Sequence, residues 1–263
     1  MKKTVNGIDL WIEQGGSGAT TLLLCHGAGC TGGVWDGLVE ILKQHWPGGW
    51  VIPDLRGHGR SDHAADYSVG HHAADMASLL RGAGDVVVCG HSMGGLIALA
   101  LASGSYGVNV THAISIGAKI SFTDEERAQM VKLSETPTRW FDTRDEAIDR
   151  FLRVSGLTGL VDTGSDVAAT GIVGKEGKFR LAADMATARV AVSAFTGELY
   201  EAAKAHTKTM LAAGSNDTMV PIPNLRKLDP DAIELTGLGH NAHVEDPNAI
   251  WKLITGTIGN NHG

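Results

Sequence analysis

Apolar and polar positions alternate in blocks along this chain, and each block predicts a strand or a helix. Short apolar runs bounded by turn residues are typical of strands buried inside a parallel sheet. Such runs lie at residues 21–25, 50–53, 85–89 and 110–116. Apolar residues recur at helical spacing over residues 34–45, 68–81 and 96–102. The alternation of strand and helix predicts an α/β fold, with a mostly parallel open sheet and helices on both faces.

The N-terminal end and the middle of the chain depart from this alternation. Residues 4–14 predict a hairpin whose two-residue turn is Asn6-Gly7. Between residues 119 and 206 the strands stop, and helical spacing is interrupted only by a glycine-rich stretch. The helical segments expected there are residues 124–133, 144–154, 179–191 and 196–205. We expect residues 119–206 to form a helical cap subdomain, inserted into a core made of residues 1–118 and 207–263.

The sheet resumes after the expected cap. Two further apolar runs, at residues 209–213 and 232–235, predict the last strands. A closing helix is expected to begin at Asp246-Pro247, since proline is favoured at the first position of a helix.

The sequence Gly90-His91-Ser92-Met93-Gly94 joins the valine-rich strand to an alanine-rich helix. A strand that turns directly into a helix needs glycines around the pivot, because side chains there would collide. The pivot residue takes a strained conformation that presents its hydroxyl at the helix N-terminus. The alternative is a glycine-rich loop with an incidental serine, but the strand before and the helix after favour a nucleophile. We therefore predict that Ser92 is a nucleophile.

A serine hydroxyl needs an adjacent base, and the base needs a carboxylate to orient it. In an open parallel sheet, such groups gather at the carboxyl ends of the strands. Asp217 follows the strand at residues 209–213, and His240 follows the strand at 232–235. The order Ser92, Asp217, His240 is the one expected when the nucleophile comes first.

Two other residues compete for these roles. His243 lies close to His240 but nearer to the last helix, so we expect it to be packed or solvated and choose His240 as the base. Asp54 also follows a strand, but its loop precedes the nucleophile in the chain, so Asp217 is the better candidate for the carboxylate.

A tetrahedral intermediate also needs N–H donors for its oxyanion. We expect one from Met93, the residue after the nucleophile. The second is expected from Ala28, because the glycines on either side of it let the backbone approach closely.

Composition limits the classes of binding partner and the cellular compartment that we expect for this protein. The formal net charge is −7 and the pI is about 5.9, without a basic stripe, so nucleic acid is not an expected partner. The three cysteines show no CxxC or Cys/His spacing, so we expect no disulfide framework, metal or cofactor. No apolar run is long enough to span a bilayer and no leader sequence is evident. We expect a reduced, cytoplasmic protein that does not bind membranes; the sequence does not indicate its oligomeric state.

Several motifs together resemble the α/β-hydrolase superfamily, in particular its branch of serine esterases and lipases. The resemblance covers residues 4–118 and 207–258. It is carried by His26-Gly27, by Asp54-x-Arg56-Gly57-x-Gly59-x-Ser61, by Gly90-His91-Ser92-Met93-Gly94-Gly95, by Asp217 before Val220-Pro221, and by Gly239-His240 before Glu245-x-Pro247. Serine at position 92 argues against the similar dehalogenase and epoxide-hydrolase branches, which have aspartate there. The segment 54–61 is expected to brace the loop beside the nucleophile.

The resemblance implies a carboxylesterase-like hydrolase (EC 3.1.1) that cleaves a small-to-medium carboxylic ester through an acyl-enzyme. Hydrolysis of a C–C bond, a lactone or an amide, and peracid formation without a cofactor, remain open. A small-molecule sensor or partner-binding protein that retains the triad is the alternative from another class. Substrate contacts are expected from His26, His91, Trp140, Phe141 and His243, although an aromatic pair such as Trp140-Phe141 more often joins a cap to a core.

Overall fold

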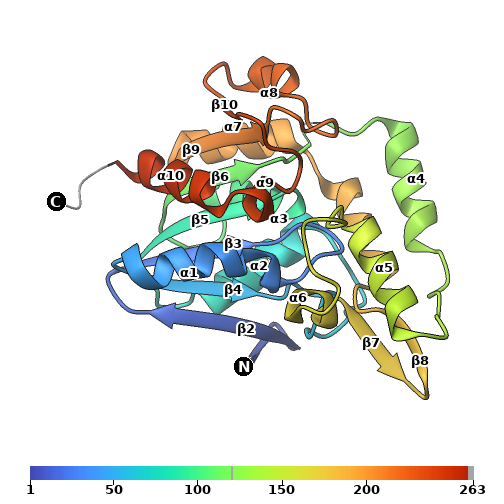
Figure 1. The fold of residues 1–263 in the computed structure, drawn as a ribbon. Coiled ribbons are helices and arrows are strands. Elements are labelled where there is room, and N and C mark those ends of the chain that lie inside the picture. Colours follow the sequence, from blue (N-terminus) through green and yellow to red (C-terminus); the bar gives the residue numbers. More distant parts are fainter. Residues whose placement is uncertain (120, 260–263) are drawn as a thin grey trace.

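The central feature of the structure is one eight-stranded sheet; the computed structural model describes residues 1–119 and 121–259. The strand order is β1-β2-β4-β3-β5-β6-β9-β10 (Figure 1). β1 and β2 are antiparallel to each other, β2 is antiparallel to β4, and the remaining pairs are parallel. The strands are β1 (Lys2–Val5), β2 (Ile8–Gly16), β3 (Thr20–Cys25), β4 (Gly49–Pro53), β5 (Asp85–His91), β6 (Val110–Ile116), β9 (Lys208–Gly214) and β10 (Ile233–Leu235). The predicted mostly parallel sheet is confirmed.

Helices cover both faces of this sheet, as its apolar strands require (Figure 1). One face carries α2 (Val69–Leu79), α3 (Met93–Ala102) and α7 (Thr196–His206). The other carries the short 3-10 helix η1 (Gly32–Trp35), α1 (Asp36–His45), α9 (Ala242–Glu245) and α10 (Pro247–Ile258). Side chains alternate along β5, so that Val86 and Val88 pack in the first layer while Val87 and Cys89 pack in the second.

The chain reverses its course across the sheet at β3, which has β4 on one side and β5 on the other. Such a reversal leaves a crevice at the carboxyl ends of the strands, where open α/β sheets bind their ligands. Ala28 follows β3 and Ser92 follows β5, so the fold brings both residues to this crevice.

The expected cap lies between β6 and β9 and sits beside the carboxyl ends of the strands (Figure 1). It contains α4 (Asp124–Ser134), α5 (Arg144–Val154), α6 (Asp166–Thr170), the hairpin β7 (Ile172–Lys175) and β8 (Lys178–Leu181), and the 3-10 helix η2 (Met185–Ser193). α4 and α5 each begin with a capping box, in which a threonine and a glutamate satisfy each other's backbone N–H groups. The last helix of the expected cap, α7, packs against α3 of the core.

The helix expected over residues 179–191 is wrong. Glu176 and Gly177 take left-handed φ angles of 51° and 76°, which close the β7–β8 hairpin. Phe179 then exchanges backbone hydrogen bonds with Phe141, which holds this segment extended. The helical part starts only at Asp184, whose carboxylate accepts a hydrogen bond from Ala186 N. The short helix α8 (Ile222–Leu228), beside β9, was not expected from the sequence.

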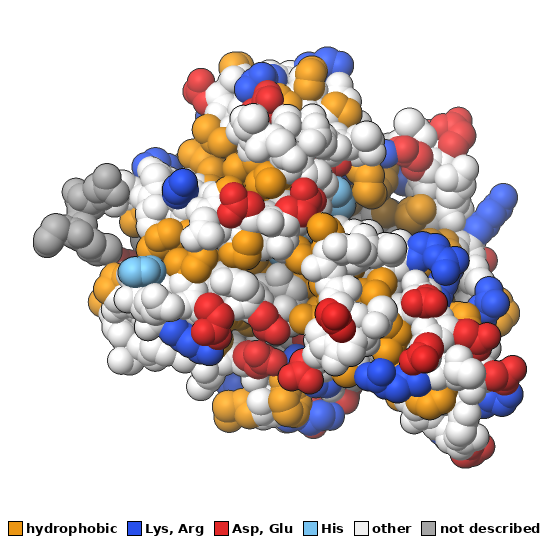
Figure 2. Space-filling model, in the orientation of Figure 1, with side chains coloured by type: hydrophobic (Ala, Val, Ile, Leu, Met, Phe, Trp, Pro, Cys, Tyr) orange, Lys and Arg blue, Asp and Glu red, His pale blue; other side chains and the backbone are white. Residues whose placement is uncertain are grey.

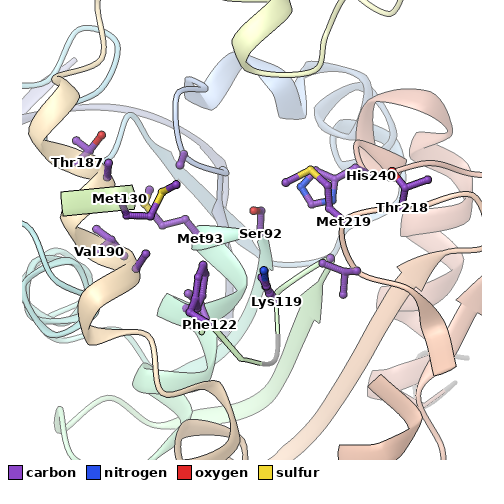
Figure 3. A pocket seen from close by; sticks show the side chains of 16 residues that line it. Ser92, Met93, Lys119, Phe122, Met130, Thr187, Val190, Thr218, Met219 and His240 are labelled. Atoms are coloured by element: carbon purple, nitrogen blue, oxygen red, sulfur yellow. The ribbon is translucent and has the colours of Figure 1, made fainter. Parts of the chain in front are cut away.

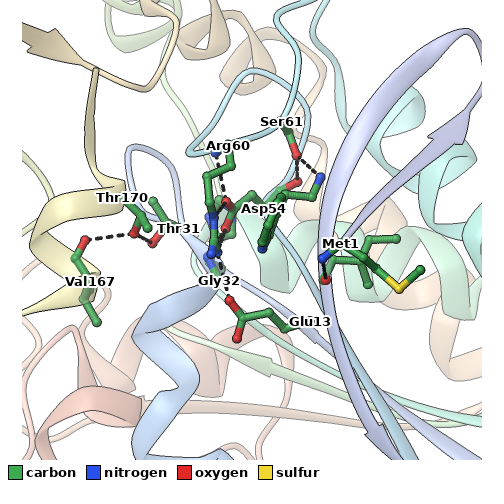
Figure 4. A network of polar contacts seen from close by, with 12 residues as sticks. Met1, Glu13, Thr31, Gly32, Asp54, Arg60, Ser61, Val167 and Thr170 are labelled. Carbon is green, nitrogen blue, oxygen red and sulfur yellow. Dashed lines mark hydrogen bonds and ion pairs between the residues drawn. The ribbon is translucent and has the colours of Figure 1, made fainter. Parts of the chain in front are cut away.

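A network around Asp54 joins the loops that follow β3 and β4 (Figure 4). Asp54 accepts hydrogen bonds from Gly32 N at 2.7 Å and from Arg60 N and Nε at 2.9 and 2.7 Å. Burial raises the pKa of Asp54, but the Arg60 contacts and the Gly32 N–H outweigh it and hold this pKa below its usual value. The ion pair between Arg56 and the buried Asp75 fixes the same loop from the other side.

None of the helices in the described parts of the chain combines the length and the apolar composition that a bilayer crossing requires. On the face seen in Figure 2, acidic and basic side chains are interspersed rather than gathered by sign.

Candidate active site

Ser92 occupies the pivot between β5 and α3 in a strained backbone conformation, with φ 52° and ψ −115°. Positive φ is rare for residues other than glycine and persists only where the surroundings enforce it. Here they do: a Cβ on Gly90 would lie 2.0 Å from Gly94 O, and a Cβ on Gly94 would lie 2.2 Å from Cys25 O. The predicted need for glycines around the pivot is therefore explained by backbone contacts.

Asp217 and His240 meet beside this pivot, although 23 positions separate them. His240 Nδ1 lies 2.8 Å from Asp217 Oδ2. The other carboxylate oxygen of Asp217 accepts hydrogen bonds from Met219 N at 2.8 Å and Val220 N at 2.9 Å. Burial raises the pKa of Asp217, but the contact with His240 and the two N–H donors more than offset it and keep this pKa below its usual value. Asp217 is thus a buried carboxylate that orients the imidazole.

Ser92 and His240 line the same cavity (Figure 3). No hydrogen bond joins Ser92 Oγ to the His240 ring within residues 1–119 and 121–259. Contacts of this kind often tighten only when a substrate is bound. Gly117, with φ 60°, passes beside the imidazole, and a Cβ at this position would lie 3.4 Å from the His240 ring and from Asp217 Oδ2.

Ala28 and Met93 also line this cavity. Met93 is the first residue of α3, so its N–H has no partner within the helix. In the described part of the chain, the Ala28 N–H finds no acceptor either. Two backbone donors are therefore available on the Ser92 side of the cavity, which is the arrangement that an oxyanion requires.

His26, His91 and His243 do not contact the cavity, contrary to our expectation of substrate contacts. These residues are 0%, 2% and 1% exposed and form a layer behind Ser92 and His240. His91 Nε2 donates to the His240 carbonyl at 2.8 Å, so His91 positions the loop that carries His240. The His243 ring packs 4.2 Å from His91, and His26 Nε2 accepts a hydrogen bond from Leu55 N.

Burial also fixes the charge of this layer. It lowers the pKa of His26, lowers that of His91 well below its usual value, and lowers that of His243 to about 3. All three rings are therefore neutral near pH 7.

The cavity has a volume of about 440 Å³ and is mostly apolar. Residues from the cap region complete its wall, and the sequence did not identify them: Phe122, Met130, Thr187 and Val190 (Figure 3). Met130 is an apolar residue on the largely charged helix α4, which is a weak signal, but spacing alone does not tell which face meets the core.

The two aromatic residues expected at the site take different positions. Trp140 is 43% exposed and lies under the Arg180 guanidinium, 5.8 Å from the ring centroid, away from the cavity. Phe141 is buried and lines a second cavity, whose wall comes mainly from the segment between β6 and β9. The expected substrate contact at Trp140 is therefore not found, since its ring faces solvent.

Comparison with known proteins agrees with this geometry. A family model described as "Alpha/beta hydrolase family" matches residues 22–252. Lipase LipV of Mycobacterium tuberculosis is 39% identical over 99 residues, which is 36% of this chain and 37% of the lipase. The pimeloyl-[acyl-carrier protein] methyl ester esterase of Nitrosomonas europaea is 41% identical over 91 residues, or 35% of this chain and 34% of the esterase. The chain thus matches little more than a third of these relatives' length.

Solved structures resemble the chain over almost all of its length. A thioesterase domain from the curacin biosynthetic pathway superposes with a TM-score of 0.79 at 19% identity, covering 97% of this chain and 98% of that one. E-2-(acetamidomethylene)succinate hydrolase also superposes with a TM-score of 0.79, at 22% identity, and the match covers 98% of both chains. The enol-lactonase of Burkholderia xenovorans gives 0.71 at 18% identity, covering 98% and 99%. At these identities the likeness establishes the fold alone.

Proposed function

The chain belongs to the α/β-hydrolase family, and from this premise we propose that it hydrolyses a small-to-medium carboxylic ester through an acyl-enzyme on Ser92. One observation carries the proposal: the hydrogen-bonded pair of Asp217 and His240 shares a cavity with a serine held at a strained strand-to-helix pivot. A carboxylate, an imidazole and a hydroxyl in this relation constitute the machinery of acyl transfer.

In the first half of the reaction, Ser92 Oγ attacks the ester carbonyl carbon while His240 Nε2 takes the hydroxyl proton. The Ala28 and Met93 N–H groups stabilise the oxyanion of the tetrahedral intermediate. The carbon–oxygen bond to the alcohol then breaks, and His240 returns the proton to the departing alcohol. The products of this half are the alcohol and an acyl group on Ser92.

In the second half, a water molecule gives a proton to His240 and attacks the acyl carbonyl. The bond to Ser92 breaks, the proton returns to Ser92 Oγ, and the carboxylic acid leaves. Asp217 stays ionised throughout and stabilises the imidazolium that forms twice. Its lowered pKa is what this role requires.

The apolar cavity and the similar proteins support an ester as the substrate. A cavity of about 440 Å³ is within the range of small-molecule sites. The similar proteins include a lipase and a methyl ester esterase, with a thioesterase and an enol-lactonase among the structural neighbours. These names all describe acyl transfer to water, but they differ in the bond that is cleaved.

The test is hydrolysis of p-nitrophenyl butyrate, hexanoate and octanoate by the parent protein and by Ser92→Ala and His240→Ala. We expect kcat/KM of both variants to fall by about 10³-fold or more, and the parent to release a burst of p-nitrophenol. His243→Gln, which keeps a polar side chain at a neighbouring buried position, is the control and should retain most of the activity.

Four outcomes would contradict the proposal in different ways. Unchanged turnover by Ser92→Ala would exclude an acyl-enzyme on Ser92. Loss of activity in His243→Gln but not in His240→Ala transfers the role of base to His243. If no ester is cleaved although a fluorophosphonate labels Ser92, lactones, amides and C–C substrates are the next to assay. A ligand that raises Tm without turnover would indicate a sensor.

A further inference from the structure

A second cavity adjoins the one that contains Ser92. Its volume is about 500 Å³, and its wall comes mainly from α4, α5 and the segments that follow α4 and β8. Residues that line both cavities mark where the two meet: Ala28, Met130, Thr187 and Ala188. A substrate whose remote end passes between these residues would reach the second cavity.

The position of His240 decides which end of the ester faces this second cavity. His240 must reach the alcohol oxygen to protonate it, so the alcohol lies on the His240 side of Ser92. Figure 3 shows Met130 and Thr187 on the opposite side of Ser92 from His240. Because Met130 and Thr187 also line the second cavity, the acyl chain is the part of the substrate that points toward it.

Two arginines line the second cavity, Arg139 and Arg150. Neither guanidinium forms an ion pair or a hydrogen bond with any of the described residues. The Arg139 guanidinium stacks 4.8 Å from the centroid of the Phe141 ring, which holds it against the cavity wall. Asp184 also lines this cavity, but its carboxylate already accepts hydrogen bonds from Tyr67 Oη at 2.7 Å and Ala186 N at 3.0 Å.

We propose that the preferred substrates are esters of acids that carry a second carboxylate at the far end of the acyl chain, bound by Arg139 and Arg150. This inference rests on the proposed esterase function. The apolar wall suits the methylene chain, and the two cations are free to pair with an anion at its end. Guanidinium groups bind carboxylates through paired N–H donors, which gives direction as well as charge.

The expected strength of the preference for a carboxylate depends on how exposed the two arginine side chains are. Both arginine side chains are exposed, so solvent and salt screen their attraction for the carboxylate. Two such contacts are worth on the order of a 10-fold preference. Because the contact is made equally in the ground state and the transition state, it should lower KM and leave kcat unchanged.

The experiment compares mono-p-nitrophenyl esters of adipate, suberate and sebacate with p-nitrophenyl hexanoate, octanoate and decanoate. We expect about 10-fold higher kcat/KM for the carboxylate series, through KM, and a smaller difference at high salt. Arg139→Gln and Arg150→Gln should each reduce the preference, and the double variant should abolish it. Arg153→Gln, on the same helix α5 but outside the cavity, is the matched control.

A binding measurement separates this inference from the esterase proposal. Suberate should raise the Tm of the parent more than the uncharged octanamide does, and the double variant should lose that difference. Equal kcat/KM for both ester series, with neutral esters still cleaved through Ser92, would overturn the carboxylate subsite and leave the esterase intact. Should no ester be cleaved at all, a suberate-specific Tm rise that needs both arginines still supports the subsite, and its absence overturns it.

Discussion

At the scale of single residues, immediate contacts set the chemical state of the site. Asp217 keeps its charge because two backbone N–H groups and the His240 ring donate to it. His91 holds the His240 loop through one hydrogen bond to a carbonyl oxygen. Each contact fixes an orientation that the proposed acyl transfer needs before the reaction begins.

Asp217→Asn tests the orientation of the imidazole. The amide oxygen can still accept from Met219 and Val220, but the amide NH₂ then faces His240 Nδ1 and favours the tautomer with its proton on Nε2. That tautomer cannot accept the Ser92 proton, so we expect kcat to fall by about 10³- to 10⁴-fold.

The measurement is ester turnover beside a thermal melt, so that a folding defect is recognised. Asp231→Asn, at an exposed position before β10, serves as the control and should behave like the parent. Full activity of Asp217→Asn would mean that another group orients the base.

At the scale of elements, the pivot between β5 and α3 requires residues that have no Cβ atom. Gly90 and Gly94 allow two backbone segments to pass closer than any side chain permits. By contrast Gly256, in α10, has no atom within 4 Å of its would-be Cβ. Glycine is therefore required at the pivot and only tolerated in the closing helix.

We make a paired prediction for Gly94 and Gly256, which both lie in helices. Gly94→Ala should lower the free energy of unfolding by about 1–3 kcal/mol or prevent folding, because its Cβ would meet Cys25 O at 2.2 Å. Gly256→Ala should raise it by about 0.5–1 kcal/mol, since alanine costs less entropy in a helix. Urea unfolding of both variants checks the pair; a stable, fully active Gly94→Ala would contradict our account of the pivot.

At the scale of the whole molecule, five histidines among residues 1–119 and 121–259 are buried: His26, His58, His72, His91 and His243. Burial lowers the pKa of each of them, to about 3 for His58 and His243. In the unfolded chain these rings titrate near pH 6.5. Below that pH the unfolded chain therefore binds more protons than the folded one, and acid destabilises the fold.

We predict that the free energy of unfolding is constant between about pH 7 and pH 8 and falls steeply between about pH 6.5 and pH 5. Each buried ring contributes up to about 1.4 kcal/mol per pH unit in this window. Urea unfolding across the range measures the slope. His72→Phe should reduce the slope of the free energy of unfolding against pH by the contribution of one buried ring. His71→Phe, at the exposed neighbouring position on α2, should leave this slope unchanged. A flat profile down to pH 5 would show that these rings are hydrated in the folded state.

The sequence by itself determined the features that depend on neighbours in the chain. Apolar runs defined the strands, because a strand buried on both faces needs continuous apolar side chains. Asn6-Gly7 defined the first turn, since both residues take the positive φ angles of 46° and 81° that a tight hairpin needs. The glycine spacing around Ser92 and the order of the strand ends predicted the pairing of Asp217 with His240, which lie 2.8 Å apart. Their catalytic roles stay predictions.

Only the tertiary structure decided the features that depend on distant partners. Residues 178–181 are a strand rather than a helix, because Phe179 pairs with Phe141 across the cap. His26, His91 and His243 lie behind the cavity rather than in it, because neighbouring elements cover them. The second cavity with Arg139 and Arg150 exists because side chains of α4 and α5 form its wall. The physical reason is the same in each case: spacing along the chain gives the period of a helix or strand, but the side that is buried depends on what packs against it.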